Sequence, residues 1–185
     1  MDIAIVGIGA TATADLARDC GLETDEITGG ITTDVYGRTS DKDIWCAGDC
    51  SAFSLDGVMT RLESVQNAID QAENVALNIL GKTTKYAPVP WFWSDQYDIK
   101  LQIAGYNRGY EHVVVRPGAK PGACSHWYFA GNDQERKLLA VDAINDAAAY
   151  MTGRRLLEAG TALTAESYAR LTDPEFDLKS LLGNT

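Results

Sequence analysis

The sequence has no apolar run of about 18 residues, the length a membrane-spanning helix needs, so it predicts no membrane span. Basic residues are also few: 16 lysines and arginines stand against 26 acidic residues, and the net charge is −10. Because nucleic-acid binding needs clustered Lys and Arg, this balance argues against a nucleic-acid partner. No basic stretch precedes the first apolar segment, so we see no signal peptide and expect a cytoplasmic protein. The 185 residues, 45% of them apolar, suit one large or two small soluble domains.

The sequence also lacks a metal-binding or redox cysteine pattern. Of its four cysteines, Cys46 and Cys50 are separated by three residues, with no second pair and only two histidines elsewhere. Zinc sites need more ligands than this, and redox motifs use a Cys-x-x-Cys spacing. Cys46 lies in a short apolar run, which predicts a buried thiol without thiol chemistry.

The first 81 residues read as an α/β segment. Residues 3–9 form an apolar run that enters a glycine turn, and this predicts a strand. Residues 13–20 suit a short helix capped by Thr13 and ended by Gly21. Residues 31–36 and 42–47 read as short strands.

The clearest helix begins near Thr60 and stops at Gly81. Thr60 and Glu63 have the spacing of a capping box. Apolar residues recur at spacings of three and four, which predicts that they share one face: Leu62, Val65, Ile69, Ala72, Ala76 and Ile79. A proline-containing linker follows, and we place a domain boundary near Lys85.

From residue 98 the pattern changes to short alternating runs punctuated by glycine. Strands are expected around residues 99–103, 113–115, 126–130 and 137–141, which indicates an antiparallel sheet. Helices are expected at 147–157 and 165–171. The fold class predicted is therefore an α/β segment followed by an α+β domain.

The turn Gly7-Ile8-Gly9-Ala10-Thr11-Ala12 fits the dinucleotide-binding fingerprint, and the acidic Glu26 follows about 20 residues later. A Rossmann half, however, needs a second parallel strand directly after the helix, and residues 23–26 are polar. A small NAD-dependent enzyme that uses this turn remains one interpretation.

Two tryptophans and a phenylalanine stand together in the run Pro90-Trp91-Phe92-Trp93-Ser94-Asp95-Gln96. The rings present flat apolar surface, and the polar tail offers groups that could meet the edge of a planar ligand. The alternative interpretation of these residues is a plain core cluster after a proline turn. Asp95 and Gln96 either form hydrogen bonds near the edge of the ring of a ligand or only fix the loop.

This run, together with residues 44–49 and 61–68, resembles the C-terminal half of FAD-dependent NAD(P)H:ferredoxin reductases. These are the putidaredoxin- and rubredoxin-reductase-like enzymes of the pyridine nucleotide-disulfide oxidoreductase superfamily. The resemblance implies that residues 1–85 are the C-terminal part of an FAD/NAD(P)-binding domain. It implies that residues 86–185 are the reductase C-terminal interface domain.

The resemblance also implies cofactor contacts, and no catalytic acid, base, nucleophile or metal. Gly48 and Asp49 match the second FAD signature, in which the Asp contacts the ribityl chain. Val65 matches a backbone contact to the isoalloxazine ring, and Trp93 matches the tryptophan beside flavin and nicotinamide. Glu63 matches a position near the nicotinamide, unless it serves only as the capping-box acid. The backbone of Gly7 and Ile8 is implied to lie near the nicotinamide.

The resembled enzymes begin with glycine turns that cradle the phosphates of FAD and NAD(P)H, and none precedes residue 2 here. We therefore expect a fragment, a truncated frame or one piece of a split enzyme, which retains no cofactor and has no activity alone. Its partners would be a ferredoxin-type iron–sulfur protein and the missing N-terminal segment.

An acidic ferredoxin would need a local basic patch on this acidic chain. The candidates are Arg154-Arg155, Arg136-Lys137 and Arg116/Lys120. The alternative is that these are ordinary solvated side chains. The alternative from another class is a non-catalytic module that binds a partner or self-associates, with relic flavin contacts.

Overall fold

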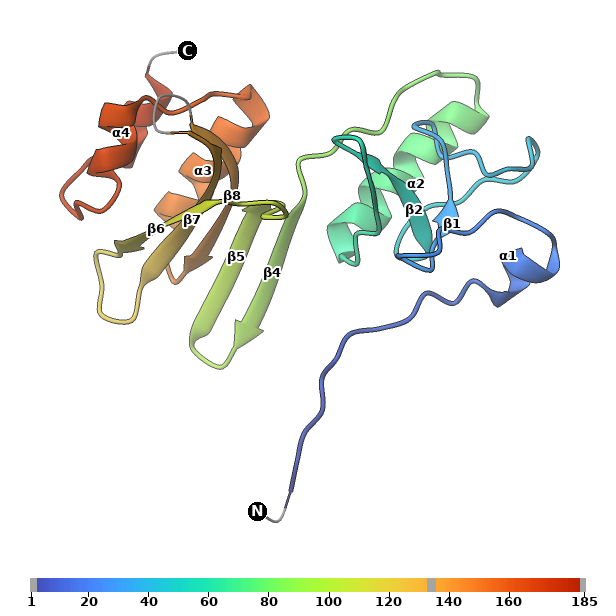
Figure 1. The fold of residues 1–185 in the computed structure, drawn as a ribbon, viewed down its shortest axis with the longest axis horizontal. Coiled ribbons are helices and arrows are strands. Elements are labelled where there is room, and N and C mark those ends of the chain that lie inside the picture. The colour runs from blue at the N-terminus through green and yellow to red at the C-terminus, as the bar shows by residue number, and fades with distance from the viewer. Residues whose placement is uncertain (1–2, 133–135, 184–185) are drawn as a thin grey trace. The chain divides into compact units, whose positions relative to one another are not determined.

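The structure is a computed structural model that describes residues 3–132 and 136–183. The chain divides into two compact units, residues 1–88 and 89–185, each with its own sheet (Figure 1). The first unit combines helices with a small mixed sheet, and the second has a larger antiparallel sheet with helices. The predicted fold class is confirmed. In the described part of the chain, no helix has the length and apolar character to cross a membrane.

The first unit is built on a three-stranded sheet in the order β1-β2-β3. β1 runs parallel to β2, and β2 and β3 form a hairpin. Asp56 and Gly57 close this hairpin with φ values of 50° and 81°, as the right-handed twist of paired strands favours. The elements are α1 (Asp15–Asp19), β1 (Ile31–Thr32), β2 (Ser51–Leu55), β3 (Val58–Thr60) and α2 (Val65–Ile79).

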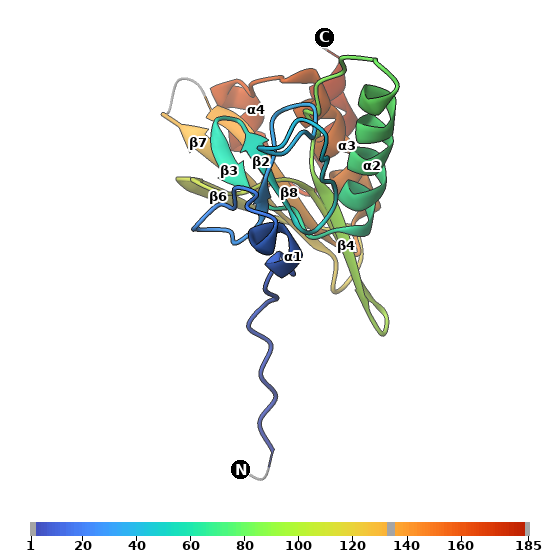
Figure 2. The ribbon, with the colours of Figure 1, turned by 90° about the vertical axis from the view of Figure 1, so that its right-hand side faces the viewer.

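The strand expected at residues 3–9 does not form. This segment runs away from the rest of the first unit without regular structure (Figures 1 and 2). Ile5 and Ile8 are 95% and 91% exposed. A strand must satisfy its N–H and C=O groups through a neighbour, and no described residue offers this segment a strand partner.

The short helix α1 also begins later than expected. It starts after Ala14, and no side chain caps it, so the cap assigned to Thr13 is wrong. Gly21, with φ of 76°, follows its end as predicted.

Most of the strand structure expected between residues 31 and 47 is absent. β1 is confined to Ile31–Thr32, and Trp45 makes only a single bridge with Arg38. The Thr39 hydroxyl donates to the carbonyl of Ile44, 2.9 Å away. Such local side-chain bonds compete with a strand ladder, and here they hold a loop.

Helix α2 begins at Val65, because the Ser64 hydroxyl accepts the backbone N–H of Asn67 at 3.1 Å. The start predicted near Thr60 and the capping box with Glu63 are therefore wrong, since Thr60 ends β3. Gly81, with φ of 89°, follows the end of α2 as predicted.

The apolar face predicted for α2 is turned outward. Val65, Ile69 and Ile79 are 60%, 48% and 58% exposed. The buried face is mostly polar and consists of Asn67, Gln71, Val75 and Asn78. The periodicity located the helix, but of the six residues that it grouped, five are exposed or half-exposed, and the buried Leu62 precedes α2.

The second unit has a five-stranded antiparallel sheet in the order β4-β5-β8-β7-β6. Helix α3 lies against β5 and β8, and the helical turn η1 lies against α3. The core between them includes the fully buried Trp127, Phe129 and Leu156. The strands are β4 (Trp91–Gln96), β5 (Ile99–Gly105), β6 (His112–Pro117), β7 (Cys124–Gly131) and β8 (Arg136–Ile144); the helices are α3 (Ala147–Ala159), α4 (Ala165–Arg170) and η1 (Leu178–Leu182).

The four strands and two helices predicted after residue 98 are all present, whereas β4 and η1 were not predicted. The aromatic run forms β4, which pairs with β5 through a turn at Tyr97, where φ is 57°. Trp91 packs at the edge of the core, with the Arg154 guanidinium 5.3 Å from its ring centroid.

Arg116 is not a surface residue, so its assignment to a basic patch is wrong. The residue is 6% exposed on β6. Its two Nη atoms donate to four backbone carbonyls, those of Leu171, Asp173, Pro174 and Phe176. A buried guanidinium thus fixes the turn after α4 to the sheet.

Candidate functional site

Asp49 lies in a loop that leads into β2, and the strand predicted before it, at residues 42–47, does not form. Gly48 before it is buried and has φ of 82°, a left-handed conformation that glycine adopts without strain. Asp49 is exposed, and its carboxylate has no hydrogen-bond partner among the described residues. It can therefore accept hydrogen bonds from a ligand.

The loop before β2 is fixed by the buried side chain of Gln71, which projects from α2. Gln71 Oε1 accepts the Gly48 N–H and the Ser51 hydroxyl, each at 2.8 Å. Gln71 is 1% exposed and Ser51 is fully buried. In the low dielectric of a protein interior such a satisfied network holds one geometry, so the loop that carries Asp49 is preorganised.

The network continues along α2 to Tyr86. The Tyr86 hydroxyl donates to Asn67 Oδ1 at 3.0 Å, while Asn67 Nδ2 donates to the carbonyl of Leu62 at 3.1 Å. Burial, followed by the nearby Asp70 charge, raises the pKa of Tyr86 well above its usual range. The phenol therefore stays a neutral hydrogen-bond donor.

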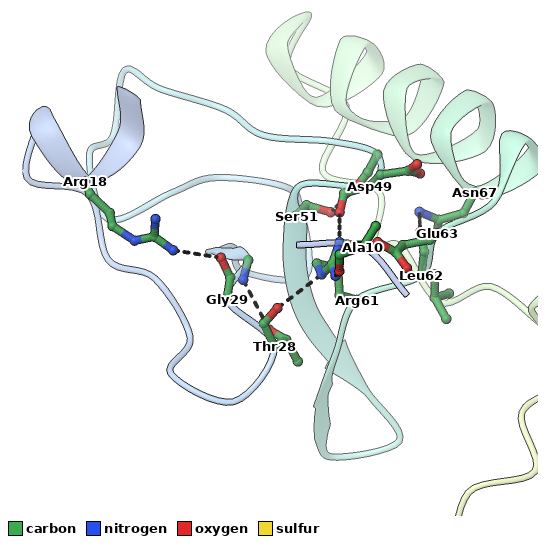
Figure 3. Close-up of polar contacts among 12 residues, drawn as sticks. Ala10, Arg18, Thr28, Gly29, Asp49, Ser51, Arg61, Leu62, Glu63 and Asn67 are labelled. Atoms are coloured by element: carbon green, nitrogen blue, oxygen red, sulfur yellow. Dashed lines mark hydrogen bonds and ion pairs between the residues drawn. The ribbon is translucent and has the colours of Figure 1, made fainter. Parts of the chain in front are cut away.

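Arg61 joins three separate segments of the first unit (Figure 3). Its guanidinium donates to the carbonyls of Asp49 at 3.0 Å, Ala10 at 3.1 Å and Thr28 at 3.2 Å. It also pairs with Glu63 Oε1 at 2.6 Å. The Arg61 side chain is only 12% exposed, so these contacts are little screened by water. The sequence placed Arg61 in the resembling segment but gave it no role.

The start of α2 presents unpaired backbone donors beside Glu63. Ser64 satisfies the Asn67 N–H and the Ala68 N–H, while those of Val65 and Gln66 have no acceptor among the described residues. This fifteen-residue helix carries partial positive charge at that end. Glu63 pairs with Arg61 and does not cap α2, which removes the capping explanation for it.

Gly7 and Ile8 stand apart from these groups. Both are exposed, and a side chain at Gly7 would meet nothing within 4 Å. Only the carbonyl of Ala10 ties the glycine turn to Arg61. The implied nicotinamide contact of Gly7 and Ile8 stays a prediction.

Trp93 belongs to the second unit, where it is 43% exposed on β4. Its ring centroid lies 5.4 Å from that of Trp91, with the planes tilted by 32°. Asp95 and Gln96 are exposed at the end of the same strand. A half-exposed indole backed by a second indole offers a flat apolar surface, and its implied place beside a flavin stays a prediction.

The residues of the first unit suit part of a flavin cofactor. An exposed carboxylate at Asp49 suits sugar-like hydroxyls, and the start of α2 suits a ring that carries negative charge. The glycine turn does not suit the cofactor's phosphates, because α1 has only five residues and no strand precedes it from residue 3 onward. The described residues therefore match the ring and ribityl ends of FAD better than its diphosphate.

Replacing Gln71 with leucine should make the Asp49 loop easier to open, lowering the free energy of its local opening by about 2 kcal/mol. The buried Gly48 N–H loses its acceptor, whereas the Ser51 hydroxyl can still donate to the Gly48 carbonyl at 2.9 Å. Hydrogen-exchange mass spectrometry of the peptides around residues 47–52 measures this, with Gln66→Leu as the matched control. Gln66 bonds only Asp70 one helical turn away, so the control should change stability by about 0.5 kcal/mol or less. Equal effects of both substitutions would refute the role given to Gln71.

Two families match successive parts of this chain. The family described as "Pyridine nucleotide-disulphide oxidoreductase" matches residues 1–72. The family described as "Reductase C-terminal" matches residues 91–182.

Similar curated proteins are ferredoxin-type reductases. Rhodocoxin reductase of Rhodococcus erythropolis is 42% identical over 180 residues, which cover 96% of this chain and 40% of that protein. Putidaredoxin reductase of Pseudomonas putida is 35% identical over 158 residues, which cover 84% of this chain and 36% of that protein. The chain thus spans about two fifths of the length of these relatives.

Solved structures agree with these matches. The ferredoxin reductase for the CYP199A2 system of Rhodopseudomonas palustris has a TM-score of 0.84 at 37% identity, covering 97% of this chain and 42% of that one. The reductase in the covalent putidaredoxin reductase–putidaredoxin complex has a TM-score of 0.84 at 32% identity, covering 98% and 42%. The class is that of the pyridine nucleotide-disulphide oxidoreductases. Within it, the chain belongs to the ferredoxin reductase family of the putidaredoxin-reductase type and matches its C-terminal part.

Proposed function

We propose that this chain is the C-terminal portion of a reductase that passes electrons from NAD(P)H through FAD to a ferredoxin-type iron–sulfur protein. The observation that carries the proposal is the geometry around Asp49. An exposed carboxylate, a buried glycine and the start of α2 are tied together by Arg61 and Gln71. The similarity of nearly the whole chain to part of the known ferredoxin reductases supports the same assignment.

In this proposal each residue positions or shields the cofactor. Asp49 accepts hydrogen bonds from ribityl hydroxyls, and the N–H groups at Val65 and Gln66 face the ring where negative charge gathers. Trp93 shields the ring from water. When bound, FAD supplies the exchange between two-electron and one-electron transfer, so the protein needs no acid, base or nucleophile.

The proposal predicts that the purified chain alone shows no flavin absorbance and does not bind added FAD stoichiometrically. The described residues hold no phosphate cradle, and phosphate contacts supply much of the anchoring of such cofactors. Absorbance near the flavin bands and an FAD titration measure this. A stoichiometric flavin spectrum would show instead that the chain holds its cofactor alone.

A chimera tests the assignment itself. Replacing the matching C-terminal part of rhodocoxin reductase with this chain should give a yellow protein that reduces a ferredoxin-type acceptor with NADH. Asp49→Ala in the chimera should weaken FAD binding by about 10- to 100-fold, the worth of hydrogen bonds to a charged group. A chimera that folds, as judged by circular dichroism, yet carries no flavin would contradict the proposal.

A non-catalytic module remains the second candidate because α2 carries an exposed apolar face. Leu80 next to it is 79% exposed, in addition to Val65, Ile69 and Ile79. Exposed apolar patches of this kind mark association sites. Sedimentation of the chain alone measures whether it self-associates. Self-association, together with a chimera that carries no flavin, would favour the non-catalytic module.

A further inference from the structure

Cys46 and Cys50, which the sequence gave no chemistry, meet in the loop before β2. Their Sγ atoms lie 3.6 Å apart, and both are free thiols. A disulfide bond is about 2.05 Å long, so the two sulfurs need to approach by only about 1.5 Å to bond. We propose that these two cysteines form a hydroperoxide-sensitive dithiol that closes reversibly to a disulfide.

Hydrogen bonds hold the backbone on both sides of the pair. The Cys46 N–H donates to the carbonyl of Gly37 at 3.0 Å, and the carbonyl of Cys50 accepts the Ile31 N–H at 2.8 Å. Gly48 between them turns the chain with φ of 82° and is fixed by Gln71. The two thiols therefore face each other without rearrangement of the loop, which gives them a high effective concentration.

The two thiols differ in reactivity, and this sets the order of events. Cys46 is 8% exposed, whereas Cys50 is partly exposed. Burial, followed by the proximity of Cys50, raises the pKa of Cys46 to about 12. Because the thiolate is the reactive form, peroxide reacts first with the sulfur of Cys50. Cys46 is the resolving cysteine, which then attacks the oxidised Cys50.

The chemistry balances with a hydroperoxide as the oxidant. The Cys50 sulfur attacks one peroxide oxygen; the O–O bond breaks, an S–O bond forms, and one water leaves when hydrogen peroxide is the reagent. The Cys46 sulfur then attacks the Cys50 sulfur, so that the S–S bond forms and the S–O bond breaks. The departing hydroxide takes the Cys46 proton and leaves as a second water. The two thiols lose two electrons, and the peroxide gains them.

Mass spectrometry tests the proposal on the whole chain, since trypsin cleaves after Lys42 and Arg61 and leaves both cysteines on one peptide, residues 43–61. The chain is treated with hydrogen peroxide, its remaining thiols are alkylated, and it is digested. We expect this peptide to lose two hydrogen masses, to resist alkylation, and to regain both thiols after reduction. If both cysteines are alkylated at a dose that oxidises the exposed Cys20, the proposal fails.

Variants test the order of the two steps. In Cys46→Ala the sulfenic acid at Cys50 has no resolving partner, so dimedone should label Cys50 several-fold more than in the unmodified chain. In Cys50→Ala, Cys46 should remain a thiol under the same treatment. Cys20→Ser is the matched control and should leave the behaviour of peptide 43–61 unchanged. Equal dimedone labelling of Cys50 with and without Cys46 would overturn the proposal.

Discussion

Replacing Arg116 with methionine should lower the free energy of unfolding of the second unit by about 3–5 kcal/mol, because four backbone carbonyls, two of them buried, lose their donor at once. Methionine keeps much of the volume and removes the hydrogen bonds, so the loss reports the bonds rather than a cavity. Urea unfolding followed by the fluorescence of the fully buried Trp127 measures it. A whole domain is stabilised by only about 5–15 kcal/mol, so this substitution takes a large share.

Two further variants bracket this result. Arg116→Lys keeps the charge but not the planar fork of donors, so we expect an intermediate loss. Arg155→Met removes an exposed arginine of α3 and should change stability by about 0.5 kcal/mol or less. Equal, small effects of the Arg116 and Arg155 substitutions would show that the carbonyl contacts contribute little.

Replacing Arg61 with alanine should loosen the candidate flavin site without touching Asp49 itself. The guanidinium holds the carbonyls of Ala10, Thr28 and Asp49 together with Glu63, and its loss should lower local stability by about 2–4 kcal/mol. Hydrogen exchange should accelerate around residues 10, 28 and 49 together, and in the reductase chimera FAD affinity should fall by about tenfold or more, since about 1.4 kcal/mol corresponds to a factor of ten.

Arg18→Ala is the matched control for this experiment. Arg18 pairs with the exposed Asp15 in the same unit and donates to the carbonyl of Gly29 at 3.4 Å. Such exposed contacts contribute little. The control should leave exchange around Asp49 and flavin affinity unchanged. Should Arg61→Ala accelerate exchange only in its own peptide, the three segments are not held together by this side chain.

The sheet of the second unit could be predicted because its information is local. Alternation in residues such as Ile99, Leu101 and Ile103 indicates a strand, and glycines mark the turns, so four of the five strands were placed correctly. β4 was missed because its adjacent aromatic residues look like a core cluster rather than an alternating strand.

The first unit was harder to predict because much of it is fixed by contacts between distant residues. α2 was located, but Gln71 and Asn67 are buried because partners from other segments satisfy them, which periodicity does not reveal. The strand expected at residues 3–9 needs a neighbour that the described chain does not contain.

The residues of the candidate site also fall into those that local sequence could predict and those that depend on distant partners. The motif around Gly48 and Asp49 could be recognised locally, while Arg61 as a junction and Arg116 as a buried residue depend on partners that lie 12 to 60 positions away. The contact between Cys46 and Cys50 was missed because their spacing matches no redox motif. It exists because a glycine turn folds the loop back on itself.

The outward apolar stripe of α2 bears on how the chain behaves in a crowded cell. The exposed side of α2 carries Val65, Ile69 and Ile79. Chaperones and proteases recognise apolar surface of this kind on incompletely folded proteins. A partner or a second copy that covers the stripe would remove this apolar surface from such recognition.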